Sequence, residues 1–231
     1  TDVSMVPTSS SNWISGSNPE YTYSYLVPVG DGSADVSLSV GVDRAGNALV
    51  PTPTSGSVFM IDNIPPVATV TYDLAWPYKG GNIVTFTATM SKSMRTTPVP
   101  QITITGEGIE TVTNGMTPSS SFPPSSSSPK YTYMYSVPVL GDGTGSISLS
   151  LGQDFAGNEI VAEPLNPVIF TVDNTLPSLI SYMTVSNNGA NNRAKIGDEI
   201  TVTFQANEEI VPIGVVIKSD MDGVLIPGSG E

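Results

Sequence analysis

Apolar and polar residues alternate along most of this chain, in short stretches separated by glycine, proline, asparagine and serine. In residues 83–90, for example, the apolar side chains of Val84, Phe86 and Ala88 alternate with threonines. A two-residue period predicts β-strands with one face on a core and the other face in water. Apolar residues do not recur at helical spacing between helix caps, so we expect almost no helix.

Between about Pro65 and Thr175 the alternation predicts seven strands. These are Val67–Tyr72, Ile83–Met90, Gln101–Thr105, Glu110–Thr113, Tyr131–Val139, Ser146–Leu151 and Val168–Val172. Turn-forming residues separate them, as in the Gly-Asp-Gly of residues 141–143. Seven short antiparallel strands in about 110 residues are typical of an immunoglobulin-like β-sandwich.

The chain also contains an internal repeat. The pentapeptide D-x-A-G-N occurs at residues 43–47 and 154–158, and Asp154 follows Asp43 by 111 residues. A period of this length is typical of an independently folded sandwich rather than of a solenoid unit. Aligning the copies predicts that residues 1–64 form the C-terminal half of one repeat, 65–175 a complete repeat and 176–231 the N-terminal half of another. We therefore expect tandem all-β, immunoglobulin-like, seven-strand β-sandwich domains.

Composition excludes several classes of function. Eight basic and 21 acidic residues give a formal net charge of −13, which disfavours nucleic acid and anionic lipid as partners and favours cations. The chain has no cysteine and no histidine, so disulfides, thiolate or imidazole metal sites and histidine general bases are ruled out. These residues contain no apolar run long enough to span a membrane, so we expect no membrane insertion here.

Catalytic residues are not evident either. Glu208 and Glu209 are adjacent on an extended segment, so their side chains diverge. A catalytic acid and base must instead flank one bond, with carboxyl groups about 5–9.5 Å apart. We therefore expect that the protein is not an enzyme.

Two surface features could bind a ligand. Tyr131, Tyr133 and Tyr135 share one face of a strand, and the favoured interpretation is that their rings are buried with hydroxyl groups at the rim. The alternative is an aromatic binding platform. Residues 116–130 are rich in serine and proline, a composition typical of a long mobile loop.

The pentapeptide is fully explained as a turn, since aspartate caps it while glycine and asparagine tolerate positive φ. In a seven-strand sandwich, however, the loop between strands six and seven shares one end with the loop between strands two and three and with the incoming linker. At the junction that enters the complete repeat, this arrangement brings together Asp62 and Asn63 of the linker with Asp154 and Asn158 of the pentapeptide.

At the junction that leaves the complete repeat, Asp173 and Asn174 of the linker are expected to meet Glu208 and Glu209 of the next repeat. Carboxylate and amide oxygens suit a hard cation, and Ca²⁺ accepts six to eight of them in adaptable geometry. The sequence thus predicts structural Ca²⁺ at the junctions. Ser91 and Lys92 align with the acidic pair, and a lysine repels a cation, so the leaving junction is the better candidate. Asp43 and Asn47 lack their linker and should be the poorest ligands.

These motifs carry a resemblance to a known family. D-x-A-G-N, then V-D-N-T-x-P, then A-K-x-G-D-x-I-T-V-T-F with a following acidic pair resembles the bacterial immunoglobulin-like tandem repeats of giant surface adhesins. The third motif, residues 194–204, is similar to repeats of flavobacterial gliding and attachment adhesins. The resemblance covers nearly the whole chain and implies an extracellular stalk on the bacterial cell surface. It also implies Ca²⁺ between domains, with the aspartates and asparagines named above as ligands.

We therefore expect a structural stalk or spacer whose immediate partners are neighbouring repeats of the same chain. One alternative is an adhesion module that binds a glycan or a surface protein through the tyrosine face or the Ser/Pro-rich loop. A second alternative is a subunit that self-assembles into an extracellular filament or surface layer. A third is an accessory region of a secreted hydrolase.

Overall fold

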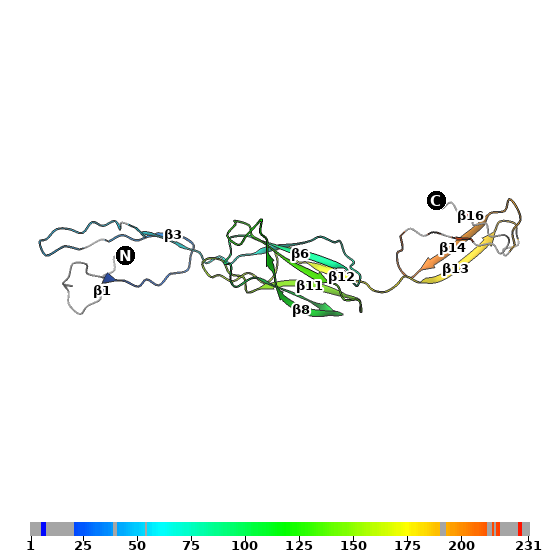
Figure 1. Cartoon of the computed structure of the whole chain (residues 1–231), viewed down its shortest axis with the longest axis horizontal. Coiled ribbons are helices and arrows are strands. Elements are labelled where there is room, and N and C mark those ends of the chain that lie inside the picture. Colours follow the sequence, from blue (N-terminus) through cyan, green and yellow to red (C-terminus); the bar gives the residue numbers. More distant parts are fainter. Residues whose placement is uncertain are drawn as a thin grey trace. The chain divides into compact units, whose positions relative to one another are not determined.

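The computed structural model describes residues 6–7, 21–38, 41–53, 55–189, 193–211, 214, 216–217 and 226–227. The chain divides into two compact units, Thr1–Asp173 and Asn174–Glu231. Within the described residues, every regular element is a β-strand (Figure 1). Those residues include no helix of the length and hydropathy that a membrane crossing requires.

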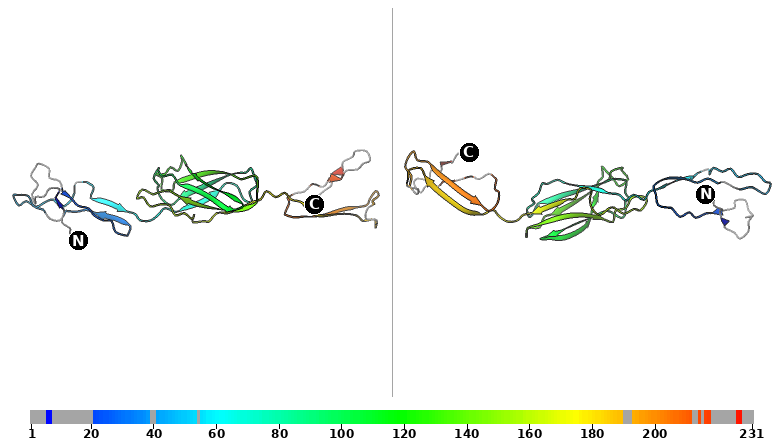
Figure 2. Two further views of the ribbon diagram at one scale, coloured as in Figure 1. Left: turned by 90° about the horizontal axis from the view of Figure 1, so that it is seen from below. Right: turned by 180° about the vertical axis from the view of Figure 1, so that it is seen from behind.

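The central part of the first unit holds two four-stranded antiparallel sheets (Figures 1 and 2). The first sheet has the order β5-β6-β10-β9, and the second has the order β12-β11-β7-β8. The bounds are β5 Ala68–Tyr72, β6 Ile83–Met90, β7 Gln101–Glu107, β8 Ile109–Gly115, β9 Thr117–Pro118, β10 Lys130–Ser136, β11 Gly143–Ser150 and β12 Ile169–Val172. All seven expected strands are present, and β9 is an additional short strand at a sheet edge. We call residues 68–172 the sandwich.

The sandwich core lies between these two sheets. Val84, Phe86, Ala88 and Met90 of β6 are all at most 1% exposed, as their alternation with threonines predicts. Phe170 of β12 contacts the Phe86 ring across the core, with ring centroids 5.8 Å apart. Hydrophobic burial of such side chains provides most of the stability of a β-sandwich.

Two sequence predictions fail at the edges of this core. Leu151, the last residue of the expected strand Ser146–Leu151, lies outside β11 and is 46% exposed, because β11 ends at Ser150 and Leu151 turns away with φ 64°. The Ser/Pro-rich loop, expected to be free, is bonded to the β6–β7 loop. The Met94 backbone N–H donates to the Pro124 carbonyl at 2.7 Å, and the Ser93 hydroxyl donates to the Ser126 carbonyl at 2.9 Å.

Gly145 of β11 lies where the core has no space for a side chain. A Cβ atom at this position would lie 2.5 Å from Cζ of Phe170. The Phe170 ring therefore packs directly on the glycine backbone, which requires the smallest residue.

The remaining described strands form two-stranded antiparallel pairs: β1 Val6–Pro7 with β2 Tyr21–Thr22, β3 Gly32–Asp35 with β4 Val58–Ile61, β13 Leu179–Ser186 with β14 Ile200–Ala206, and β15 Val216–Ile217 with β16 Ile226–Pro227. Several of their apolar side chains are exposed: Met60 of β4 is 74% exposed and Tyr182 of β13 is 71% exposed. The division at residues 64/65 falls inside the first compact unit, so the three-part division remains a prediction.

Candidate functional site

Three segments meet at one end of the sandwich, which we call the entry end. They are the incoming linker of residues 62–66, the β6–β7 loop and the β11–β12 loop. Met94 and Asp154 form an antiparallel bridge between the two loops. The Val161 N–H donates to the Pro66 carbonyl at 2.9 Å and ties the linker to the second loop. The loops therefore share one end, as the sequence predicts.

The D-x-A-G-N loop at the entry end is organised by its own aspartate. Oδ1 of Asp154 accepts hydrogen bonds from the backbone N–H groups of Gly157 and Asn158, both at 2.9 Å. The Asn158 side-chain amide donates to Oδ2 of Asp154 at 2.9 Å. Gly157 has φ 99°, a left-handed conformation in which glycine carries no steric penalty. The turn thus forms from local hydrogen bonds.

The other copy of the pentapeptide forms the same turn. Oδ1 of Asp43 accepts from the backbone N–H groups of Ala45 and Asn47 at 2.8 Å, and the Asn47 side-chain amide donates to Oδ2 at 2.7 Å. Gly46 has φ 90°. Asp43 and Asn47 are exposed, so this copy forms the turn in contact with solvent.

At the entry end, the ammonium group of Lys92 lies among the predicted metal ligands. Its Nζ donates to both carboxylate oxygens of Asp62, at 2.8 and 2.9 Å. It also donates to the Ile64 carbonyl at 2.6 Å and lies 3.3 Å from Oδ2 of Asp154. The Lys92 and Asp62 side chains are 26% and 38% exposed, whereas the Asp154 side chain is only 2% exposed.

Both members of the Lys92–Asp154 pair have shifted pKa values. Burial acts to raise the pKa of the Asp154 carboxyl, but hydrogen bonds from Asn158, Lys92 and Gly157 outweigh burial and leave it below its usual value. Burial acts to lower the pKa of Lys92, but its contacts with Asp62 and Asp154 raise it above the usual value. Both groups are therefore charged at neutral pH.

The entry end suits this ammonium group better than a metal ion. Asp62 and Asp154 already direct carboxylate oxygens at Lys92. Asn158 presents its N–H side, because Nδ2 donates to the Asp62 carbonyl as well as to Asp154. Asn63 directs its side-chain amide to the Gly30 carbonyl and its backbone N–H to Asp31. Three of the four predicted ligands thus come together, and Asn63 does not join them.

The acidic pair of the second unit differs. The backbone N–H of Asn207 donates to the Ser178 carbonyl, as that of Ser91 donates to the Val67 carbonyl in the sandwich. This equivalence aligns Glu208 with Lys92, one position away from the sequence alignment, because β13 has an irregular register between Leu179 and Ser181. One carboxylate oxygen of Glu208, Oε1, is buried without a hydrogen-bond partner among the described residues.

A buried carboxylate oxygen of this kind is chemically suited to a hard cation. Glu209 is exposed beside Glu208, while Asp173 closes the first unit and Asn174 begins the second. The described residues contain no cluster of three or more acidic, histidine or cysteine side chains. The assignment of Ca²⁺ ligands therefore remains a prediction.

The sequence did not identify Lys92 as a partner of these carboxylates, although it stands just after a strand that leads to the entry end. Arg95 was also missed: its Nη2 donates to the Phe155 carbonyl at 2.9 Å and holds the outer side of the pentapeptide loop. A basic residue following strand two was the available signal. Its carboxylate partners could be found only from the fold.

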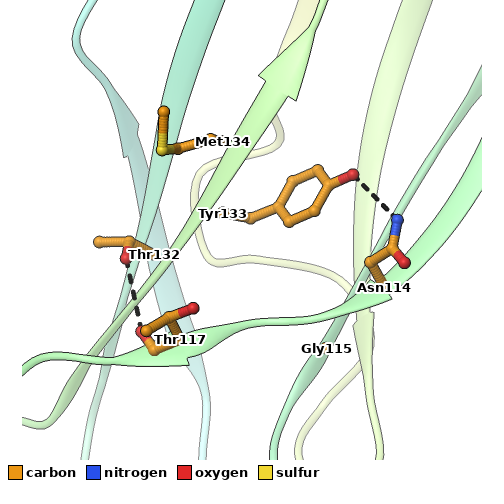
Figure 3. Close-up of a pocket in the computed structure, with 6 residues that line it drawn as sticks. All are labelled: Asn114, Gly115, Thr117, Thr132, Tyr133 and Met134. Carbon is orange, nitrogen blue, oxygen red and sulfur yellow. Dashed lines mark hydrogen bonds between the residues drawn. The ribbon is translucent and has the colours of Figure 1, made fainter.

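The tyrosine face is mostly core. Tyr131 and Tyr135 are 1% and 2% exposed, so their rings are buried as expected. The prediction that their hydroxyl groups lie at the rim is wrong, because both hydroxyl oxygens are buried, without a hydrogen-bond partner among the described residues. Tyr133 is only partly buried and packs at the edge of the core. Its hydroxyl group accepts a hydrogen bond at 2.9 Å from the Asn114 side-chain amide, which links β10 to β8 (Figure 3).

An open hollow of about 530 Å³ lies beside Tyr133, where the short β9 leaves the sheet edge uncovered (Figure 3). It is lined by Asn114, Gly115, Thr117, Thr132, Tyr133 and Met134. This volume is in the range of small-molecule sites, about 300–1,000 Å³, although such sites are usually concave and more enclosed. The hollow presents hydroxyl and amide groups beside one aromatic ring.

Comparison with known proteins gives no independent identification: no family model, no curated protein and no solved structure matches this chain.

Proposed function

We propose that the chain is a stalk or spacer of tandem immunoglobulin-like, seven-strand β-sandwich repeats in a large bacterial cell-surface or secreted adhesin. The observation that carries this proposal is that the polypeptide enters and leaves the sandwich at opposite ends. The incoming linker is bonded beside Lys92, whereas the Asp173 N–H donates to the carbonyl of Tyr78, in the β5–β6 connection at the other end. Domains joined in this way add length with each repeat.

Two further observations support a repeat that carries load. In both copies of D-x-A-G-N the asparagine donates its backbone N–H and its side-chain amide to the aspartate, so the repeated sequence specifies a similar local structure. The linker is held by hydrogen bonds rather than left free, since Asp62 and Pro66 bond to loops of the sandwich. Proline in this linker restricts bending further.

Calcium is part of this proposal at the junction that leaves the sandwich. Asp173, Asn174, Glu208 and Glu209 would hold the ion, and Oε1 of Glu208, which has no hydrogen-bond partner among the described residues, supports the assignment. Bound Ca²⁺ would neutralise carboxylates that otherwise repel one another and would limit motion between repeats.

The test is small-angle scattering and thermal unfolding of the full chain, with and without EDTA. We expect an extended scattering profile, and we expect EDTA to broaden the distribution of dimensions and to lower the melting temperature. Asp173→Ala should reproduce the EDTA effect, whereas Glu110→Ala, an exposed control on β8, should not. A compact profile would contradict the stalk. If EDTA changed neither the scattering profile nor the melting temperature, the proposed binding of Ca²⁺ would be contradicted.

The hollow beside Tyr133 favours a second candidate function, the binding of a glycan or an exposed protein segment. A glycan array probed with the full chain would test it. Tyr133→Ala should abolish binding, and Tyr72→Ala, an exposed tyrosine on β5, should leave it intact.

A further inference from the structure

The strongest unassigned feature is the environment of the Lys92 ammonium group. Four oxygen atoms from two segments, the linker and the pentapeptide loop, surround Nζ: two from the Asp62 carboxylate, one from the Ile64 carbonyl and one from the Asp154 carboxylate. An ammonium group donates three hydrogen bonds and accepts none, so an all-oxygen environment satisfies it. The same environment, with two carboxylates and a carbonyl, is typical of a bound metal ion.

We propose that Lys92 takes the place of a metal ion at the entry end, tying the linker to the pentapeptide loop, so that this junction stays closed without any dissolved cation. The inference rests on the geometry of the entry end and does not depend on the stalk function or on calcium elsewhere.

Charge explains why a cation is required at this position. Asp154 is almost fully buried, and a buried carboxylate is tolerated only when it is paired and hydrogen-bonded. Asn158 and the loop N–H groups satisfy part of the hydrogen-bonding capacity of the Asp154 carboxylate, but they bring no positive charge. Asp62 approaches with a second negative charge. Lys92 compensates both carboxylates at once.

The two units carry side chains of opposite charge at equivalent positions. Lys92 lies two residues after the end of β6, the second strand of the β5–β6 hairpin. Glu208 lies two residues after the end of β14, the second strand of the β13–β14 hairpin. The lysine forms ion pairs with carboxylates, whereas one carboxylate oxygen of the glutamate has no hydrogen-bond partner among the described residues. The sign of the charge at this position therefore decides whether a junction contains its own cation or needs one from solution.

Four variants of the full chain test the proposal: Lys92→Met, Lys92→Glu, Lys92→Arg and, as a matched control, Lys79→Met, which removes an exposed lysine from a turn. Hydrogen exchange is followed by mass spectrometry in peptides that cover residues 61–67 and 154–161. Peptides covering residues 101–107 report whether the sandwich remains folded. Because these readouts are local, changes elsewhere in the chain do not affect them.

In the parent chain, exchange at the entry end should be the same in EDTA and in CaCl₂. Lys92→Met should accelerate it about tenfold in both solutions, as expected for the loss of one charged hydrogen-bonding partner. Lys92→Glu should accelerate it in EDTA, and CaCl₂ should restore protection. Lys92→Arg, which keeps the charge, should retain most of the protection.

Three results would overturn the proposal. EDTA could accelerate exchange at the entry end of the parent chain, which would mean that a metal is bound there. Lys92→Met could behave like Lys79→Met, which would mean that the contacts are incidental. The intact mass of the parent chain could be lower than the sequence mass by one ammonia or one water, which would mean that Lys92 is covalently joined to Asn158 or to an aspartate.

Discussion

The two copies of the D-x-A-G-N loop have the same internal structure in different surroundings. In both, the aspartate accepts two backbone N–H groups and the asparagine side chain donates back to it. Asp43 is exposed, whereas Asp154 is 1% exposed and pairs with Lys92. The comparison shows that the pentapeptide specifies its own turn, and that the tertiary structure decides whether the aspartate of the turn is buried and paired with a charged side chain.

The same contrast holds in the strands that precede these loops. Gly145 of β11 pairs with Phe170, and Ala34 of β3 pairs with Phe59 in the equivalent register. The larger residue is accommodated in the two-stranded pair, where Phe59 is only partly buried. In the complete sandwich the Phe170 ring occupies that space. Packing, rather than strand formation, therefore imposes the glycine.

The largest difference between the two loops should appear on removal of the aspartate. Asp154→Ala leaves Lys92 without its buried partner and leaves the loop N–H groups unsatisfied. We expect the free energy of unfolding of the sandwich to fall by about 2–3 kcal/mol, somewhat less than for a fully buried pair because Lys92 can rehydrate. Urea unfolding of the full chain, followed by circular dichroism, measures the change.

Asp43→Ala is the matched control for this experiment. It removes the same carboxylate from an exposed turn, and it should leave unfolding of the sandwich unchanged. An equal loss in both variants would show that the turn itself, and not the pairing of Asp154 with Lys92, accounts for the effect.

A somewhat smaller effect is expected from Gly145→Ala. The new methyl group would overlap the Phe170 ring, and overpacking of this kind costs about 1–3 kcal/mol of stability. Differential scanning calorimetry should show a lower melting temperature for the sandwich. Ala34→Gly, the reverse change at the equivalent site, should leave that transition in place. An unchanged melting temperature in Gly145→Ala would mean that the Phe170 ring can move aside.

The smallest effect is the response to acid. Because the pKa of Asp154 is lower in the folded state than in the unfolded chain, its contribution to stability is complete above the unfolded value. It is lost as the pH falls below the unfolded value and through the lower folded value. The stability difference between the parent chain and Asp154→Asn should therefore shrink over this range. A constant difference, measured by urea unfolding at each pH, would contradict the shifted pKa.

Much of this fold was predictable because its signals are local in sequence. Alternation identified all seven strands, and turn chemistry identified the pentapeptide loop. Alternation did not reveal that β11 ends before Leu151 or that the two-residue β9 pairs at the sheet edge, because both depend on where neighbouring strands stop. Strand order alone was enough to predict that the incoming linker, the β6–β7 loop and the β11–β12 loop lie at the same end of the sandwich.

The candidate site was predicted only in part. Asp62, Asp154 and Asn158 come together as strand order indicates, whereas Asn63 bonds to Gly30 and Asp31 instead. The alignment of Lys92 with the acidic pair was one position off. An irregular register in β13 shifts the pairing of that hairpin, and such irregularities leave no clear mark in a sequence.

By itself, the sequence determined the repeat, the all-β class and the pentapeptide turn. Each depends on contacts between residues a few positions apart or on simple alternation. Only the tertiary structure decided that the cation at the entry end is a lysine. Lys92 is 30 residues from Asp62 and 62 residues from Asp154, so their contact exists only once the linker and both loops have been brought to the same end of the sandwich.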